Sequence, residues 1–148
     1  MAALNRFLAA SGLLLAASAA HALDYRTTSR PAVLYDAPST AAAKVAVAGS
    51  GLPLEIVIET EGWIKVRDHG GRLTWIEQSA FGTIRNAMVK AEATSVRKQP
   101  RPDAEAVFLA ARGVLLEITG EPDGFGWLPV KHADGQAGWV PMFEVWGR

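Results

Sequence analysis

Apolar and polar residues alternate in two neighbouring segments near the middle of the chain. In residues 54–59 the apolar side chains at 54, 56 and 58 fall on one face, and in residues 62–67 Ile64 and Val66 lie opposite Trp63. A period of two residues is typical of strands with one buried face. The pattern therefore predicts two strands whose aliphatic face lies in a core.

Turn residues follow these segments. Residues 69–71 contain two glycines and precede a further apolar segment at 73–76, and Asp134-Gly135 stands at the corresponding place near the C-terminus. Because glycine adopts positive φ at little cost, each position predicts a β-hairpin. The ends of residues 41–48 and 103–110 predict short strands after long loops.

Pro129 stands inside an otherwise strand-like segment. Proline cannot donate a backbone hydrogen bond, so we expect its strand to lie at a sheet edge or to contain a bulge.

The chain after residue 23 contains an internal repeat. Residues 32–60 align with 94–122 at a shift of 62, and Gly62-Trp63 aligns with Gly126-Trp127 at a shift of 64. An ordered set of matching glycines and tryptophans is a signature of duplicated units. We therefore predict two domains at 24–83 and 84–148, each of about 60 residues and close to the lower limit for an independent core.

The N-terminal residues 1–22 have the features of a secretory signal peptide. An apolar run at 7–20 is shorter than the roughly 20 residues of a membrane span, and Ala20-His21-Ala22 fits a signal-peptidase site. We expect cleavage after Ala22, without stable membrane insertion afterwards, and a periplasmic or secreted product. The alternative is an uncleaved N-terminal anchor.

Composition narrows the function classes. Hydrophobic residues make up 49% and charged residues 20%, as in folded domains. Fifteen basic residues balance fifteen acidic ones, which argues against a nucleic-acid partner. The absence of cysteine excludes disulfides, thiolate zinc sites and a cysteine nucleophile.

Candidate catalytic groups are sparse. His21, His69 and His132 are far apart, and the last two stand in turns rather than beside a positioned nucleophile. We therefore expect no enzymatic activity, no metal site and no cofactor.

The ordered motifs of both copies resemble the bacterial SH3-like (SH3b) domain in tandem. The second copy carries Gly126-Trp127-Leu-Pro-Val130 and the closing Gly135-Gln-Ala-Gly-Trp-Val140, preceded by Ser95-Val-Arg97, Pro100 and Gly113 with residues 116–118. In the first copy Gly62-Trp63-Ile-Lys-Val66 matches equally well, but Thr74 replaces the closing glycine. The resemblance implies an all-β fold of two five-stranded small barrels, and binding of wall peptides or protein segments in the cell envelope.

Eukaryotic relatives hold proline-rich helices in an aromatic groove, and neither copy has that groove complete. Glu77 stands where the groove proline would be in the first copy. In the second copy Pro141 is present, but Arg97 and Glu144 replace groove tyrosines.

The candidate ligand site lies in the second copy. Trp127 and Phe125 would provide aromatic contact, and Arg97, Lys98 and Arg101 would attract a carboxylate. The alternatives are a core or domain-seam role for the aromatic residues and a solvated loop for the basic ones.

The first copy offers a weaker candidate. Trp63 corresponds to Trp127, and Tyr35 stands in the loop that corresponds to the basic one. The two loops differ in charge, so we expect the copies to bind different ligands.

These observations predict a non-catalytic envelope module that binds a peptide, either a stem peptide of peptidoglycan or an extended segment of a partner protein. Two alternatives are an assembly scaffold of an envelope complex and an accessory subunit of a separately encoded wall hydrolase.

Overall fold

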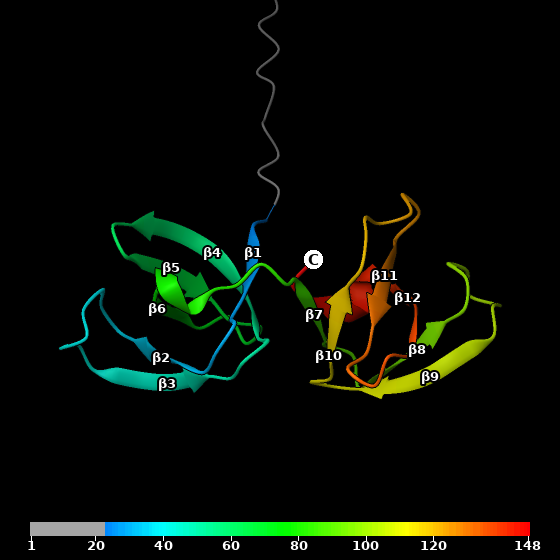
Figure 1. The fold of residues 1–148 in the computed structure, drawn as a ribbon, viewed down its shortest axis with the longest axis horizontal. Helices are drawn as coiled ribbons and strands as arrows, with labels where there is room; N and C mark the ends of the chain where they lie inside the picture. The colour runs from blue at the N-terminus through cyan, green and yellow to red at the C-terminus, as the bar shows by residue number, and fades with distance from the viewer. Residues whose placement is uncertain (1–22) are drawn as a thin grey trace, which may run out of the picture.

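A computed structural model describes residues 23–148 and shows two antiparallel sheets side by side (Figure 1). The first sheet contains β1 (Tyr25–Thr27), β2 (Ala32–Tyr35), β3 (Lys44–Ala48), β4 (Pro53–Thr60), β5 (Trp63–Arg67) and β6 (Leu73–Glu77). The second contains β7 (Asn86–Val89), β8 (Ala93–Arg97), β9 (Ala106–Ala111), β10 (Leu115–Ile118), β11 (Trp127–Lys131), β12 (Ala137–Pro141) and β13 (Val145–Trp146). The all-β class is confirmed.

The two sheets have related strand orders. The first runs β1-β4-β5-β6-β2-β3 and the second β13-β7-β10-β11-β12-β8-β9, and strand pairing does not close either sheet into a barrel. A single 3-10 turn follows the last long strand of each sheet, η1 at Gln78–Ala80 and η2 at Met142–Glu144. The predicted hairpins are confirmed as β5–β6 and β11–β12, and the predicted short strands as β3 and β9.

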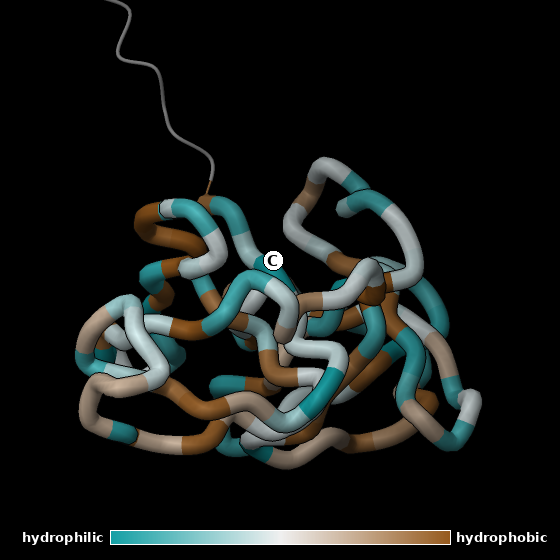
Figure 2. The backbone as a smooth tube through the Cα atoms, turned by 60° about the vertical axis from the view of Figure 1, so that its left-hand side comes forward, coloured by the Kyte–Doolittle hydropathy of each residue, from teal (hydrophilic) through white to brown (hydrophobic). Residues whose placement is uncertain are grey.

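Each sheet packs its aliphatic face into a separate core. Ile64 and Val66 are fully buried in the first core, and Leu128 and Val130 are buried in the second. Figure 2 shows hydrophobic and hydrophilic residues interspersed along the chain in both halves of the molecule. The predicted orientation of both strands is confirmed, because period-two alternation places these pairs on the covered face.

Pro129 does not lie in an edge strand. Its strand β11 is interior, between β10 and β12, so the expectation from the sequence is wrong. The physical reason is that β10 ends at Ile118, which is paired with Val130. Beyond that point the Pro129 carbonyl accepts a hydrogen bond from the Thr119 N–H at 3.0 Å, and the ladder needs no donor from Pro129.

The two sheets meet through β1 and β4 on one side and β7 and β13 on the other. The Trp146 ring meets Tyr25 edge-on, with centroids 5.1 Å apart, and its Nε1 donates to the Pro53 carbonyl at 3.2 Å. The Asn86 amide donates to the Gly51 carbonyl at 2.9 Å. Burial raises the pKa of the Tyr25 hydroxyl. This seam therefore joins residues that are distant in sequence.

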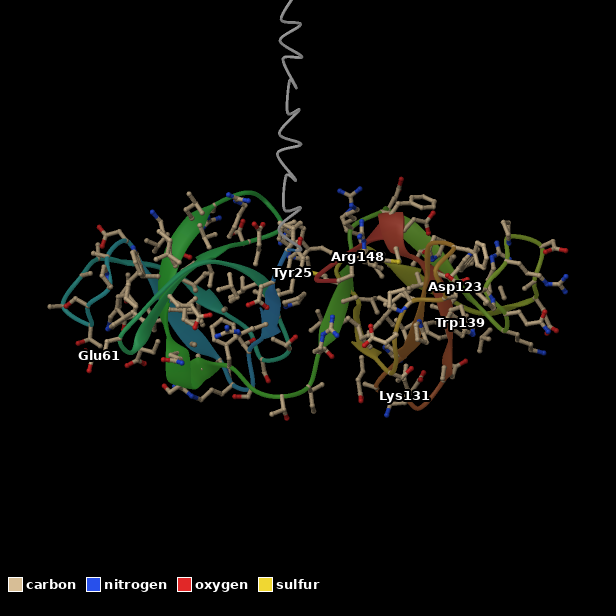
Figure 3. All side chains as sticks on the ribbon, turned by 90° about the horizontal axis from the view of Figure 1, so that it is seen from above. Tyr25, Glu61, Asp123, Lys131, Trp139 and Arg148 are labelled. Atoms are coloured by element: carbon tan, nitrogen blue, oxygen red, sulfur yellow. The ribbon has the colours of Figure 1, made fainter. Side chains whose placement is uncertain are left out.

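A glycine allows the close approach at the seam. Gly147 has φ of 99°, and a Cβ there would lie 2.5 Å from Pro53. Figure 3 shows Tyr25 and Arg148 near each other where the two sheets meet. A larger residue at Gly147 would force the sheets apart.

Within residues 23–148 no helix is long and apolar enough to span a bilayer. The predicted signal peptide at 1–22 lies outside the described residues.

Candidate functional site: a charged groove in the second sheet

A groove of about 330 Å³ lies on the second sheet, between β8, the start of β11, the end of β12 and η2. Its lining combines aromatic, aliphatic and charged side chains: Ala93, Thr94, Ser95, Arg97, Pro102, Leu109, Trp127, Pro141, Phe143 and Glu144. The groove thus contains two of the residues predicted for the ligand site, Arg97 and Trp127.

Trp127 forms a buried wall of this groove. Its side chain is only 9% exposed, and β-pairing places it opposite Pro141. The carboxylate of Asp123 accepts hydrogen bonds from the backbone N–H groups of Phe125 at 2.8 Å and of Trp127 at 3.0 Å. These bonds fix the loop before β11 and hence the position at which Trp127 enters the groove.

Arg97 ends β8 at the other side of the groove. Its Nη1 donates to the carbonyl of Ala104 at 2.7 Å, which fixes the guanidinium while leaving further N–H donors. It forms no ion pair with any residue in 23–148. The positive charge is therefore held in place and remains available to an anion.

Glu144, in η2, provides a negative charge to the same groove. Its carboxylate accepts a hydrogen bond from the Thr94 hydroxyl, and Thr94 is buried at the start of β8. The Glu144 carbonyl also accepts bonds from the backbone N–H groups of Lys90 at 2.9 Å and Ala91 at 3.3 Å. Glu144 forms no ion pair within the described part of the chain. The groove therefore contains a negative charge at Glu144 and a positive charge at Arg97, and a hydrogen bond holds each side chain in place.

The other predicted residues of the second copy lie apart from the lining. Phe125 is 91% exposed in the loop before β11. Lys98 pairs with Glu105 at 2.7 Å and Arg101 with Asp103 at 3.5 Å, so the basic loop neutralises much of its own charge. The structure brings Trp127 and Arg97 together but leaves Phe125, Lys98 and Arg101 outside the groove.

In the first copy the predicted residues pack against each other. Tyr35 is only 7% exposed, and its ring meets Trp63 edge-on with centroids 5.4 Å apart. Trp63 is paired with Glu77, where the second copy has Pro141. The aromatic rings that were candidates for ligand contact here fill space in their own domain.

Sequence reasoning missed Thr94 and Leu109 as groove residues, and it noted Glu144 only as a departure from an aromatic groove. The internal repeat could have indicated that Thr94 and Glu144 are functional residues. Thr94 and Glu144 align with Ala32 and Ala80, so both positions change from small apolar residues to polar ones in the same copy.

The turn that contains His132 in the second copy is held together by interactions among its own side chains. His132 Nδ1 lies 3.1 Å from the Asp134 carboxylate. The backbone N–H of Gln136, together with its side-chain amide, lowers the pKa of Asp134 to about 2. Such a carboxylate is ionised at neutral pH and is a poor proton acceptor. Within residues 23–148 no group of three or more histidine, aspartate or glutamate side chains is placed to hold a metal.

The fold defines a tandem module of two β-domains, and the second of them carries the groove described above. The family model for the bacterial SH3 domain matches residues 28–81 and 90–147. The chain therefore belongs to the bacterial SH3 domain family, with two tandem copies. Members of this family are binding modules of the cell wall, typically outside the cytoplasm.

Two solved structures share a distant likeness, NlpC1 and NlpC2 from Trichomonas vaginalis. NlpC1 is 14% identical with a TM-score of 0.39, and the match covers 94% of this chain and 51% of that one. NlpC2 is 11% identical with a TM-score of 0.39, and the match covers 84% and 47%. This chain spans about half the length of each. No curated protein matches.

Proposed function

We propose that the second SH3 domain is a non-catalytic module of the cell envelope that binds an extended peptide in the groove beside Trp127. The supporting observation is that Trp127 and Arg97 line one groove while their counterparts in the first domain, Trp63 and Tyr35, pack together. An aromatic wall supplies desolvated contact area, and a fixed guanidinium orients a carboxylate.

Wall peptide is the ligand class that the family favours, and a segment of a partner protein has the same backbone chemistry. The test is sedimentation of the mature protein, residues 23–148, with purified peptidoglycan. We expect Trp127→Ala to weaken binding by about 2 kcal/mol or more, and Trp63→Ala to leave it unchanged.

Trp127 is largely buried, so its replacement needs a fold control. Near-ultraviolet circular dichroism reports the packing, and Arg97→Glu alters the same groove at a half-buried position. Loss of binding in Trp63→Ala but not in Trp127→Ala or Arg97→Glu would place the site in the first domain. Recovery of proteins by crosslinking, without sedimentation on peptidoglycan, would favour the scaffold function.

We also propose export with removal of residues 1–22. The supporting observation is the apolar run ending at Ala20-His21-Ala22. Mass spectrometry of fractionated cells should find an N-terminus at Leu23 in the periplasm or medium. An intact Met1 on a membrane-bound product would contradict it.

A further inference from the structure

We propose that the groove selects a short dipolar peptide, with a cationic group held at Glu144 and a carboxylate held at Arg97. This inference rests on the proposed function and specifies the chemistry and direction of its ligand. Neither charge has an ionic partner within residues 23–148, although both line the same groove. A ligand with the complementary charges would supply both partners.

The two positions that hold the charges lie near opposite ends of β8. Glu144 is held at Thr94, and Arg97 lies three residues further along the same strand. An extended strand rises about 3.3 Å per residue, so these two positions are about 10 Å apart. An extended tripeptide has about the same length along its backbone.

A hydrogen bond restrains each of the two charged side chains. The Thr94 hydroxyl donates to Glu144, and the Ala104 carbonyl accepts from Arg97. These bonds restrict each side chain before the ligand arrives, which lowers the entropy lost on binding. The exposed ring of Phe143 stands next to Glu144 in the same lining and can contact an ammonium by a cation–π interaction.

The rest of the groove lining is largely apolar. It includes Leu109, Trp127 and Pro141, and β-pairing places the last two opposite one another across β11 and β12. This surface suits the aliphatic parts of a small-residue peptide and provides no further charge. Opposite charges at the ends therefore set the direction of the bound chain, carboxylate towards Arg97.

The first domain lacks both charges of this arrangement and the hydroxyl that holds one of them. Ala32 and Ala80 stand in place of Thr94 and Glu144, and Tyr35 stands in place of Arg97. Ala32 and Ala80 are both buried. The dipolar groove is thus a property of one copy and not of the shared scaffold.

The test uses trialanine as the probe, with its ends free, N-acetylated, C-amidated or both blocked. Binding to the mature protein is followed through the Trp127 indole N–H signal in an NMR titration. We expect N-acetylation and C-amidation each to weaken binding about tenfold. Glu144→Gln should abolish the effect of N-acetylation, and Arg97→Gln should abolish the effect of C-amidation.

Glu117→Gln and Lys131→Gln are the matched controls, since these residues form an ion pair on β10 and β11 outside the groove. Both controls should retain the preference for free ends. Equal binding of all four trialanine forms would overturn the dipolar proposal and leave peptide binding intact. The same holds if wall fragments shift Trp127 and no trialanine form does. If neither wall fragments nor trialanine shift Trp127, the proposed function fails as well.

Discussion

The two domains share a scaffold and differ at the groove. In both, the long loop after the first repeated strand is closed by equivalent bonds: the Asp36 N–H donates to Ala43 at 3.1 Å, and the Lys98 N–H donates to Glu105 at 3.0 Å. Both also place a buried aliphatic pair on the equivalent central strand. At the groove positions, by contrast, the first domain has Ala32, Tyr35 and Ala80, where the second has Thr94, Arg97 and Glu144.

This difference separates what the fold requires from what a ligand requires. The Tyr35–Trp63 contact satisfies the first domain internally, whereas Arg97 and Glu144 keep charges near a surface that no residue of 23–148 neutralises. Half-buried charges without ionic partners carry a desolvation cost, so their presence in one copy points to a ligand.

The largest expected effect tests the shared scaffold. Val66→Ala and Val130→Ala should each lower the free energy of unfolding by about 1–3 kcal/mol, because both side chains are fully buried. Thermal and urea unfolding measure this. Val47→Ala, at an exposed position of β3, should change stability by less than about 0.5 kcal/mol. Unchanged stability in both core variants would contradict the placement of Val66 and Val130 in the two cores.

The next effect concerns the seam. Trp146→Ala removes the contact with Tyr25 and the hydrogen bond to Pro53, and should cost about 1–2 kcal/mol. Calorimetry should show the two domains unfolding more independently, while Trp146→Phe retains part of the coupling. A single unchanged transition in Trp146→Ala would mean that Trp146 does not contribute to the coupling of the domains.

Exchange of the groove lining tests the comparison itself. Thr94→Ala, Arg97→Tyr and Glu144→Ala together give the second domain the residues of the first at these three positions. We expect peptide binding to fall at least tenfold, about 1.4 kcal/mol, because both charges are lost. Calorimetric titration with wall fragments measures it, and retained affinity would show that the lining does not set binding.

The smallest effect is expected in the basic loop. Lys98→Gln and Arg101→Gln remove exposed charges that already pair with Glu105 and Asp103. Binding should fall less than about threefold and only at low salt, since exposed pairs and distant charges are screened. A large, salt-resistant loss would place this loop in the site.

The sequence predicted the scaffold well because its signals are local. Alternation sufficed to orient Val66 and Val130, and the glycine at 135, with φ of 93°, marked a hairpin turn. The expectation for Pro129 was wrong because a proline requires only that its own side of the strand lacks a pairing partner at that position. The sequence did not show that the neighbouring strand β10 ends before reaching Pro129.

The site was harder because its contacts are long-range. Trp127 and Arg97 were found from the repeat, whereas the Thr94–Glu144 bond joins residues 50 positions apart. Phe125 lies in the loop that leads to Trp127. The direction of its side chain depends on the hydrogen bond between its backbone N–H and the Asp123 carboxylate. The sequence likewise did not predict the ion pairs that Lys98 and Arg101 form within the basic loop.

The most direct measurement is an NMR titration of the indole N–H signals of the mature protein with soluble wall peptide fragments. All five tryptophans lie within residues 23–148, so each domain and the seam has its own reporters. The account predicts that the Trp127 signal shifts progressively while those of Trp63 and Trp146 stay in place. A shift of Trp63 without one of Trp127 would contradict it.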